Sequence, residues 1–170
     1  MIVTRRRFIE LAAMAAIALS SLSVTGCDQE SLADLIGVAG TSLSQLLGAL
    51  GQGSTTLASN LAALFAVARN SVLTWVKGSP AQDVIQALNN VLAAIARIPV
   101  TSGTSVLISI AIAAIEHVIE AIDPSAIPLP SAQAANLKWS RFARTPKEIY
   151  KSAWNGEIAN HPELAAAKLK

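Results

Sequence analysis

Residues 31–50 read SLADLIGVAGTSLSQLLGAL, and the spacing of their apolar side chains decides the fold. The spacings alternate between four and three residues, in the order Leu32, Ile36, Ala39, Leu43, Leu46, Leu50. This period places the apolar side chains on one face of a helix. The glycines within the stretch weaken a helix by about 1 kcal/mol each relative to alanine, and close packing against a neighbour would account for them. The stretch therefore predicts an amphipathic helix with one buried face.

Three further stripes with the same period follow, over residues 57–76, 84–98 and 108–122. The connections between them span only a few residues, which favours antiparallel neighbours. Residues 106–115 are rich in β-branched side chains and resemble a strand, but their stripe continues at helical spacing to Ile122. We therefore predict an all-α protein with an antiparallel four-helix bundle over residues 31–122. The expected core residues are Leu43, Leu47, Leu61, Leu64, Leu88, Leu92, Ile112, Ile115 and Ile119.

Two short motifs predict where helices begin. Ser79-Pro80-Ala81-Gln82 resembles a capping box with Ser79 as N-cap, and it follows a predicted helix end at Lys77-Gly78. Thr145-Pro146-Lys147-Glu148 is a second capping box, which opens a short helix near the C-terminus.

The chain after the fourth stripe differs in composition from the predicted bundle. Residues 123–136 contain three prolines and predict an extended linker, and residues 137–170 form a basic aromatic arm. Because aromatic and basic side chains dominate interface hot spots, we predict that this arm binds a protein partner. The residues expected to do so are Trp139, Arg141, Phe142, Arg144, Lys147, Tyr150, Lys151 and Trp154. Two alternatives stay open: the arm covers its own bundle, or its bases rest on anionic lipid headgroups.

Residues 1–26 have the organisation of an export signal: three arginines at positions 5–7, then a modestly apolar run. Arg5-Arg6-Arg7-Phe8-Ile9 resembles a twin-arginine signal, carried by Arg5, Arg6 and Phe8. Val24-Thr25-Gly26-Cys27 resembles the lipobox of bacterial lipoproteins, composed here of Val24, Thr25, Gly26 and Cys27. This resemblance implies cleavage before Cys27 and a lipid on its sulfur. Residues 27–30 then form a short tether. The alternative, an uncleaved membrane helix, is disfavoured because the apolar run is shorter than the roughly 20 residues that a bilayer requires.

Composition and charge narrow the function classes. The chain has 170 residues, 52% hydrophobic and 14% charged, with a formal net charge of +2, which is too weak for bulk nucleic-acid binding. Its single cysteine excludes an internal disulfide framework and a multi-cysteine zinc site. Glu116, His117 and Glu120 fall within about one helical turn, and we interpret them as a polar helix face rather than a metal or acid–base site. We expect no catalytic residues, no metal and no cofactor.

These observations predict a lipid-anchored, non-enzymatic accessory or structural subunit of a cell-envelope or membrane protein complex. It would attach to the membrane through Cys27 on the non-cytoplasmic side and bind a protein partner; no small-molecule substrate is indicated. Asp28 resembles the residue that retains some lipoproteins in the inner membrane, which favours the periplasmic face of that membrane over the outer membrane. The alternatives are a membrane-embedded or membrane-active helical protein, and a carrier of an apolar ligand inside the bundle.

Overall fold

The computed structural model describes residues 28–101, 103–126 and 145–170, and all regular secondary structure in these ranges is helical. The predicted all-α class is confirmed. Predictions on residues 1–27 and 127–144 lie outside the described residues. The elements are α2 (Gln29–Ala49), α3 (Thr56–Thr74), α4 (Gln82–Ile95), α5 (Ser105–Ile122), the 3-10 helix η1 (Pro124–Ala126), α7 (Pro146–Ile158) and the 3-10 helix η2 (Pro162–Ala167).

Helix α2 starts two residues before the predicted boundary at residue 31, because Asp28 is its N-cap. The carboxylate of Asp28 accepts a hydrogen bond of 2.7 Å from the backbone N–H of Ser31. An N-cap carboxylate satisfies one of the backbone donors that a helix start leaves without an intrahelical partner. Two of the four residues of the predicted tether, Gln29 and Glu30, therefore belong to the helix.

The turn between α3 and α4 differs from both predictions made for it. Helix α3 ends at Thr74, and Trp75 has extended backbone angles, so the predicted end at Lys77-Gly78 is wrong by about one turn. Gly78 has a φ of +91°, a conformation that glycine adopts without strain. Helix α4 begins after Ala81 without a side-chain cap. Ser79 is not the N-cap, because its hydroxyl donates to the carbonyl of Val76 at 2.6 Å within the turn.

Helix α5 runs without a break from Ser105 to Ile122, so residues 106–115 are helical and the strand alternative is wrong. Nine of its side chains are buried, and the core includes the β-branched Ile108, Ile115 and Ile119. A buried helix tolerates β-branched residues because tertiary packing overrides their weak helix propensity.

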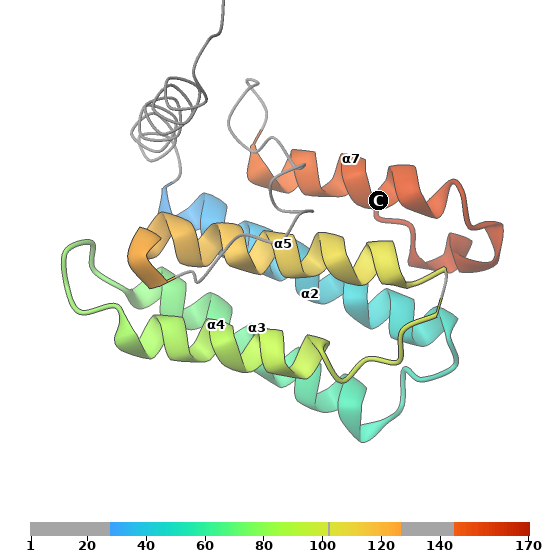
Figure 1. Ribbon diagram of the computed structural model, residues 1–170, viewed down its shortest axis with the longest axis horizontal. Helices are drawn as coiled ribbons and strands as arrows, with labels where there is room; N and C mark the ends of the chain where they lie inside the picture. The colour runs from blue at the N-terminus through green and yellow to red at the C-terminus, as the bar shows by residue number, and fades with distance from the viewer. Residues whose placement is uncertain (1–27, 102, 127–144) are drawn as a thin grey trace, which may run out of the picture.

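The helices are arranged in three layers (Figure 1). Helices α2 and α5 form the middle layer and contact each other; α3 and α4 cover one side of it, and α7 covers the other. The core lies on both sides of α2, which also contacts η2. Of the predicted core residues, six are buried: Leu43, Leu47, Leu61, Leu88, Ile115 and Ile119. The other three are partly buried and pack against the same core: Leu64, Leu92 and Ile112.

Candidate functional site: the capped C-terminal helix and the cavity beside residue 28

The C-terminal helix α7 begins at the predicted capping box. The hydroxyl of Thr145 accepts a hydrogen bond from the backbone N–H of Glu148 at 3.3 Å, and the carboxylate of Glu148 accepts one from the N–H of Thr145 at 2.9 Å. Both bonds satisfy donors at the helix start, and Pro146 suits the first helical position because it has no N–H to leave unpaired. This prediction is confirmed.

Two residues predicted to anchor a partner lie in the core of this chain instead. Tyr150 and Trp154 are fully buried, and their rings stack with centroids 5.8 Å apart. The indole of Trp154 donates to the carbonyl of Ala167 at 2.9 Å, and the hydroxyl of Tyr150 forms a short hydrogen bond with the hydroxyl of Ser42 on α2. Burial raises the pKa of Tyr150 well above its usual range, outweighing the hydrogen bond from Ser42. The reason for the correction is the packing of α7 on α2 and α5, which leaves neither ring free for another protein.

The two lysines of α7 that were predicted to contact a partner also contact their own chain. Lys147 lies 3.5 Å from the carboxylate of Asp34, which is also 3.9 Å from Arg69 of α3. Lys151 donates to the backbone carbonyl of Lys170. The alternative in which the arm covers its own bundle therefore describes residues 145–170. Outside the described residues are the other predicted partner-binding residues, Trp139, Arg141, Phe142 and Arg144, and the export and lipidation residues, Arg5, Arg6, Phe8, Val24, Thr25, Gly26 and Cys27.

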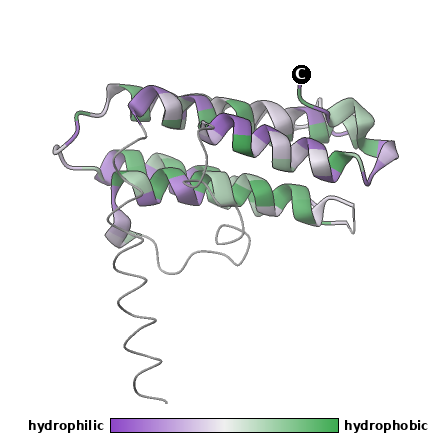
Figure 2. Ribbon diagram, turned by 90° about the horizontal axis from the view of Figure 1, so that it is seen from above, coloured by the Kyte–Doolittle hydropathy of each residue, from purple (hydrophilic) through white to green (hydrophobic). Residues whose placement is uncertain are grey.

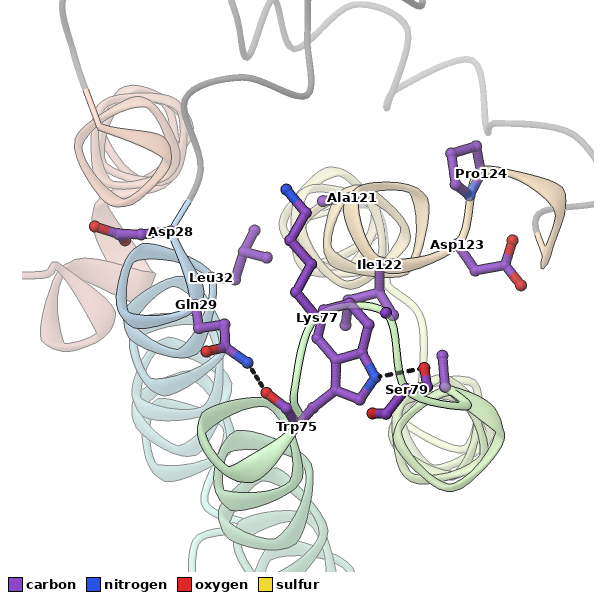
Figure 3. Close-up of a pocket in the computed structure, with 12 residues that line it drawn as sticks. Asp28, Gln29, Leu32, Trp75, Lys77, Ser79, Ala121, Ile122, Asp123 and Pro124 are labelled. Atoms are coloured by element: carbon purple, nitrogen blue, oxygen red, sulfur yellow. Dashed lines mark hydrogen bonds between the residues drawn. The ribbon is translucent and has the colours of Figure 1, made fainter.

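A cavity of about 710 Å³ lies at the end of the molecule where the described chain begins (Figure 3). Its walls come from the start of α2, the turn between α3 and α4, and the end of α5. Leu32, Trp75 and Ile122 form apolar walls, and Gln29, Lys77 and Ser79 contribute polar groups. The sequence pattern did not reveal this cavity, because its residues come from four separate helix ends.

The turn that borders the cavity is fixed to the first turn of α2. The side-chain amide of Gln29 donates to the carbonyl of Trp75 and to that of Val72, the latter at 3.3 Å. These carbonyls belong to the end of α3, where the backbone acceptors lack intrahelical partners. The indole N–H of Trp75 donates to the carbonyl of Ser79 at 3.3 Å, which closes the turn.

Two carboxylates at the edge of the cavity are already engaged in local hydrogen bonds. The side chain and backbone of Ser31 hydrogen-bond to Asp28 and lower the pKa of its carboxyl group. The side chain and backbone of Ser125 do the same for Asp123, whose carboxylate accepts at 2.6 and 2.9 Å. In Figure 3 both carboxylates point away from the centre of the cavity, whereas Lys77 extends its amine over it.

The histidines do not form a metal site within the described residues, where no group of three or more His, Cys, Asp or Glu side chains could hold an ion. His117 was interpreted as part of a polar helix face. It is half-buried, and burial lowers its pKa to about 4. The two ring nitrogens of His161 lie 3.2 Å from a carboxylate oxygen of Glu157 and 3.2 Å from one of Glu163. The sequence analysis missed this cluster, although Glu157 lies four residues before His161 and Glu163 two residues after it.

Three of the described helices, α2, α3 and α5, are long and apolar enough to cross a membrane by length and composition alone. The hydropathy colours in Figure 2 show hydrophilic residues interspersed along the helices, so their apolar character is interrupted. Helix α5 is the most apolar of the three.

No protein-family model, curated protein or solved structure matches this chain.

Proposed function

We propose that this protein is a lipid-anchored, non-enzymatic accessory or structural subunit of a cell-envelope or membrane protein complex. The observation that carries the proposal is the lipobox-like Val24–Cys27 sequence, which is followed at once by Asp28, the N-cap of the first helix of the folded body. Two or three acyl chains on Cys27 would attach this body firmly, since each buried methylene contributes about 0.8 kcal/mol. The body would then be held directly against the membrane surface on the non-cytoplasmic side.

Helices α2 to α5 form, in this proposal, the antiparallel four-helix bundle expected from the sequence, with α7 as an added fifth helix. Contacts between α2 and α3, α3 and α4, α4 and α5, and α5 and α2 support it, because they close a ring. The cavity adds support: an alternation of chain direction brings the starts of α2 and α4 and the ends of α3 and α5 to the same end, and all four regions line it.

The surface proposed to bind the partner is the segment from Trp139 to Arg144. Its two aromatic and two arginine side chains have the composition of interface hot spots. In this proposal α7 attaches the C-terminal end of this segment to the bundle, and the segment itself binds the partner. The burial of Tyr150 and Trp154 supports the role of α7.

The test is affinity purification of the tagged, lipidated protein from its native membrane. We expect a defined set of co-purifying proteins that is lost when Trp139, Arg141, Phe142 and Arg144 are replaced by alanine. The matched control replaces Ser59, Asn60 and Asn70, exposed residues of α3, by alanine. A partner set that survives the first quadruple substitution contradicts this docking segment, and mass spectrometry that finds no lipid on Cys27 contradicts the anchor.

A membrane-embedded helical protein is the second candidate, favoured by the length and hydropathy of α2, α3 and α5. The Cys27→Ser variant separates the two candidates, provided that its signal is still removed. A lipid-anchored body becomes soluble when the acyl chains are lost, whereas an embedded one stays with the membrane after extraction at alkaline pH. Release of the variant into the soluble fraction supports the anchored candidate.

A further inference from the structure

We propose that the protein meets its membrane end-on, with the turn Trp75–Gly78 and the mouth of the cavity in contact with zwitterionic phospholipid headgroups. This inference rests on the proposed lipid anchor and deepens it, because it names the surface of the body that faces the bilayer and the class of lipid that fits. The lipid at this surface belongs to the same membrane that holds the acyl chains of Cys27.

The first step is the position of the anchor relative to the cavity. Asp28 lines the cavity, and the Cα atoms of consecutive residues are about 3.8 Å apart, so an acylated Cys27 lies at this end of the body. Gln29 holds the carbonyls of Val72 and Trp75, so the turn is fixed to the same first turn of α2. An anchor attached here brings the turn to the bilayer along with it.

The second step is the chemistry of the turn. Trp75 is half-buried, and its amphipathic indole suits the boundary between headgroups and hydrocarbon. Val76 is 69% exposed, the most exposed of the large hydrophobic side chains in the described chain. Lys77 is exposed and follows directly, and a lysine can place its methylenes along apolar groups while its ammonium contacts lipid phosphates. The three consecutive side chains therefore match three zones of a bilayer surface: Val76 the hydrocarbon, Trp75 the boundary between hydrocarbon and headgroups, and Lys77 the phosphates.

The third step is the charge of this end, which selects the lipid. Of the charged residues that line the cavity, two are acids, Asp28 and Asp123, and one is a base, Lys77, so the acids at this end would repel a strongly anionic surface. The carboxylates of Asp28 and Asp123 are engaged by Ser31 and Ser125. No carboxylate among the described residues lies within ion-pair distance of Lys77, whose amine extends over the cavity (Figure 3). A headgroup with a phosphate but no net charge fits this combination.

The experiment compares two single-cysteine labels on the lipidated protein. Because the lipid occupies the thiol of Cys27, a thiol introduced by Val76→Cys or by Val100→Cys is the only one open to an environment-sensitive fluorophore. The two valines are matched in exposure, 69% and 66%. They are separated by the length of α4, about 21 Å for 14 residues. Both proteins are reconstituted into phosphatidylcholine and phosphatidylethanolamine vesicles that contain a headgroup-level nitroxide quencher.

We expect the label at position 76 to be quenched several-fold more strongly than the label at position 100. Lys77→Glu should reduce quenching at position 76, whereas Arg97→Glu, an exposed base at the far end of α4, should not. Replacing part of the zwitterionic lipid by phosphatidylglycerol should also reduce it. Equal quenching at the two positions in a protein shown by mass spectrometry to be lipidated overturns this inference and leaves the anchor intact. Absence of lipid on Cys27 overturns the proposed function, and the inference falls with it.

Discussion

Two glycines of α2 occupy opposite surroundings, and this difference gives the first prediction. A Cβ atom on Gly40 would lie 2.9 Å from Cγ of Phe65, whereas one on Gly48 would meet nothing within 4 Å. Alanine is favoured over glycine in a helix by about 1 kcal/mol, but overpacking of a core costs about 1–3 kcal/mol. We expect Gly48→Ala to raise the free energy of unfolding and Gly40→Ala to lower it, as measured by urea denaturation.

The control for this pair is Phe65→Leu, which removes part of the ring that Gly40 approaches. Combined with Gly40→Ala, it should cost less than the sum of the two single substitutions, because residues in contact are not additive. Strict additivity would contradict the close contact as the reason why position 40 is a glycine.

The half-buried His117 predicts a loss of stability on mild acidification. Its pKa is about 4 in the folded protein and about 6.5 when unfolded. Below pH 6.5 the unfolded chain binds a proton that the folded chain does not bind, so stability falls as the pH drops from 6.5 towards 4. Between pH 7.5 and pH 5 we expect the free energy of unfolding to fall by about 2 kcal/mol from this group.

The measurement is urea denaturation at both pH values for the wild type and for His117→Gln. The variant should lose much less stability between pH 7.5 and pH 5, because glutamine does not titrate. The hydrogen-bonded Asp28 and Asp123 have lowered pKa values and act only at more acidic pH, outside this window. An equal loss in the two proteins would show that other groups cause the effect.

At the scale of elements, the two predicted capping boxes should respond differently to alanine. Thr145→Ala removes an observed N-cap and should cost about 0.5–2 kcal/mol, whereas Ser79→Ala removes only a bond to Val76 within an exposed turn. Thermal unfolding followed by far-UV circular dichroism measures both. If Ser79→Ala were the more destabilising change, the assignment of the α4 start to Ala81 would be contradicted.

The same pair shows what sequence reasoning could establish about the elements. Hydrophobic periodicity predicted four helices and most of their core, because one apolar side chain per turn is a signal repeated along the whole element. A capping motif depends on which group one hydroxyl contacts, and a sequence does not say which group that will be. Thr145 contacts the helix that follows it, but Ser79 contacts Val76, which precedes it.

At the scale of the whole molecule, the burial of Trp154 predicts that α7 is required for stability. Trp154→Ala should lower the free energy of unfolding by about 3–5 kcal/mol, because it removes a large, fully buried side chain. Ser152→Ala, at an exposed position of the same helix, is the matched control and should change it by less than about 0.5 kcal/mol. Chemical denaturation of the two variants makes the comparison, and similar midpoints would contradict the packing of α7 described above.

The spacing of residues in α7 indicated this packing, but the aromatic composition of the segment indicated a binding surface instead. Pro146, Tyr150, Trp154 and Ile158 recur every four residues, and all four are buried. That spacing indicates an apolar helix face that packs against another element. Aromatic residues next to bases are also typical of a surface that binds another protein. The pattern alone could not choose between the chain's own bundle and another protein, because both bury the same face. The cavity was still less predictable, since it depends on where four helix ends meet.

The hydrogen bond between Ser42 and Tyr150 joins positions 108 residues apart, and this separation has a consequence for the order of events on the ribosome. At synthesis rates of about 5–20 residues per second, the ribosome needs about 5–20 s to extend the chain from Ser42 to Tyr150. The face of α2 that contacts Tyr150 stays uncovered for that time. During that time the Ser42 hydroxyl and the apolar side chains around it, which are buried in the folded protein, stay exposed to water and to chaperones. Native packing around α2 therefore completes only after translation has reached the last helix.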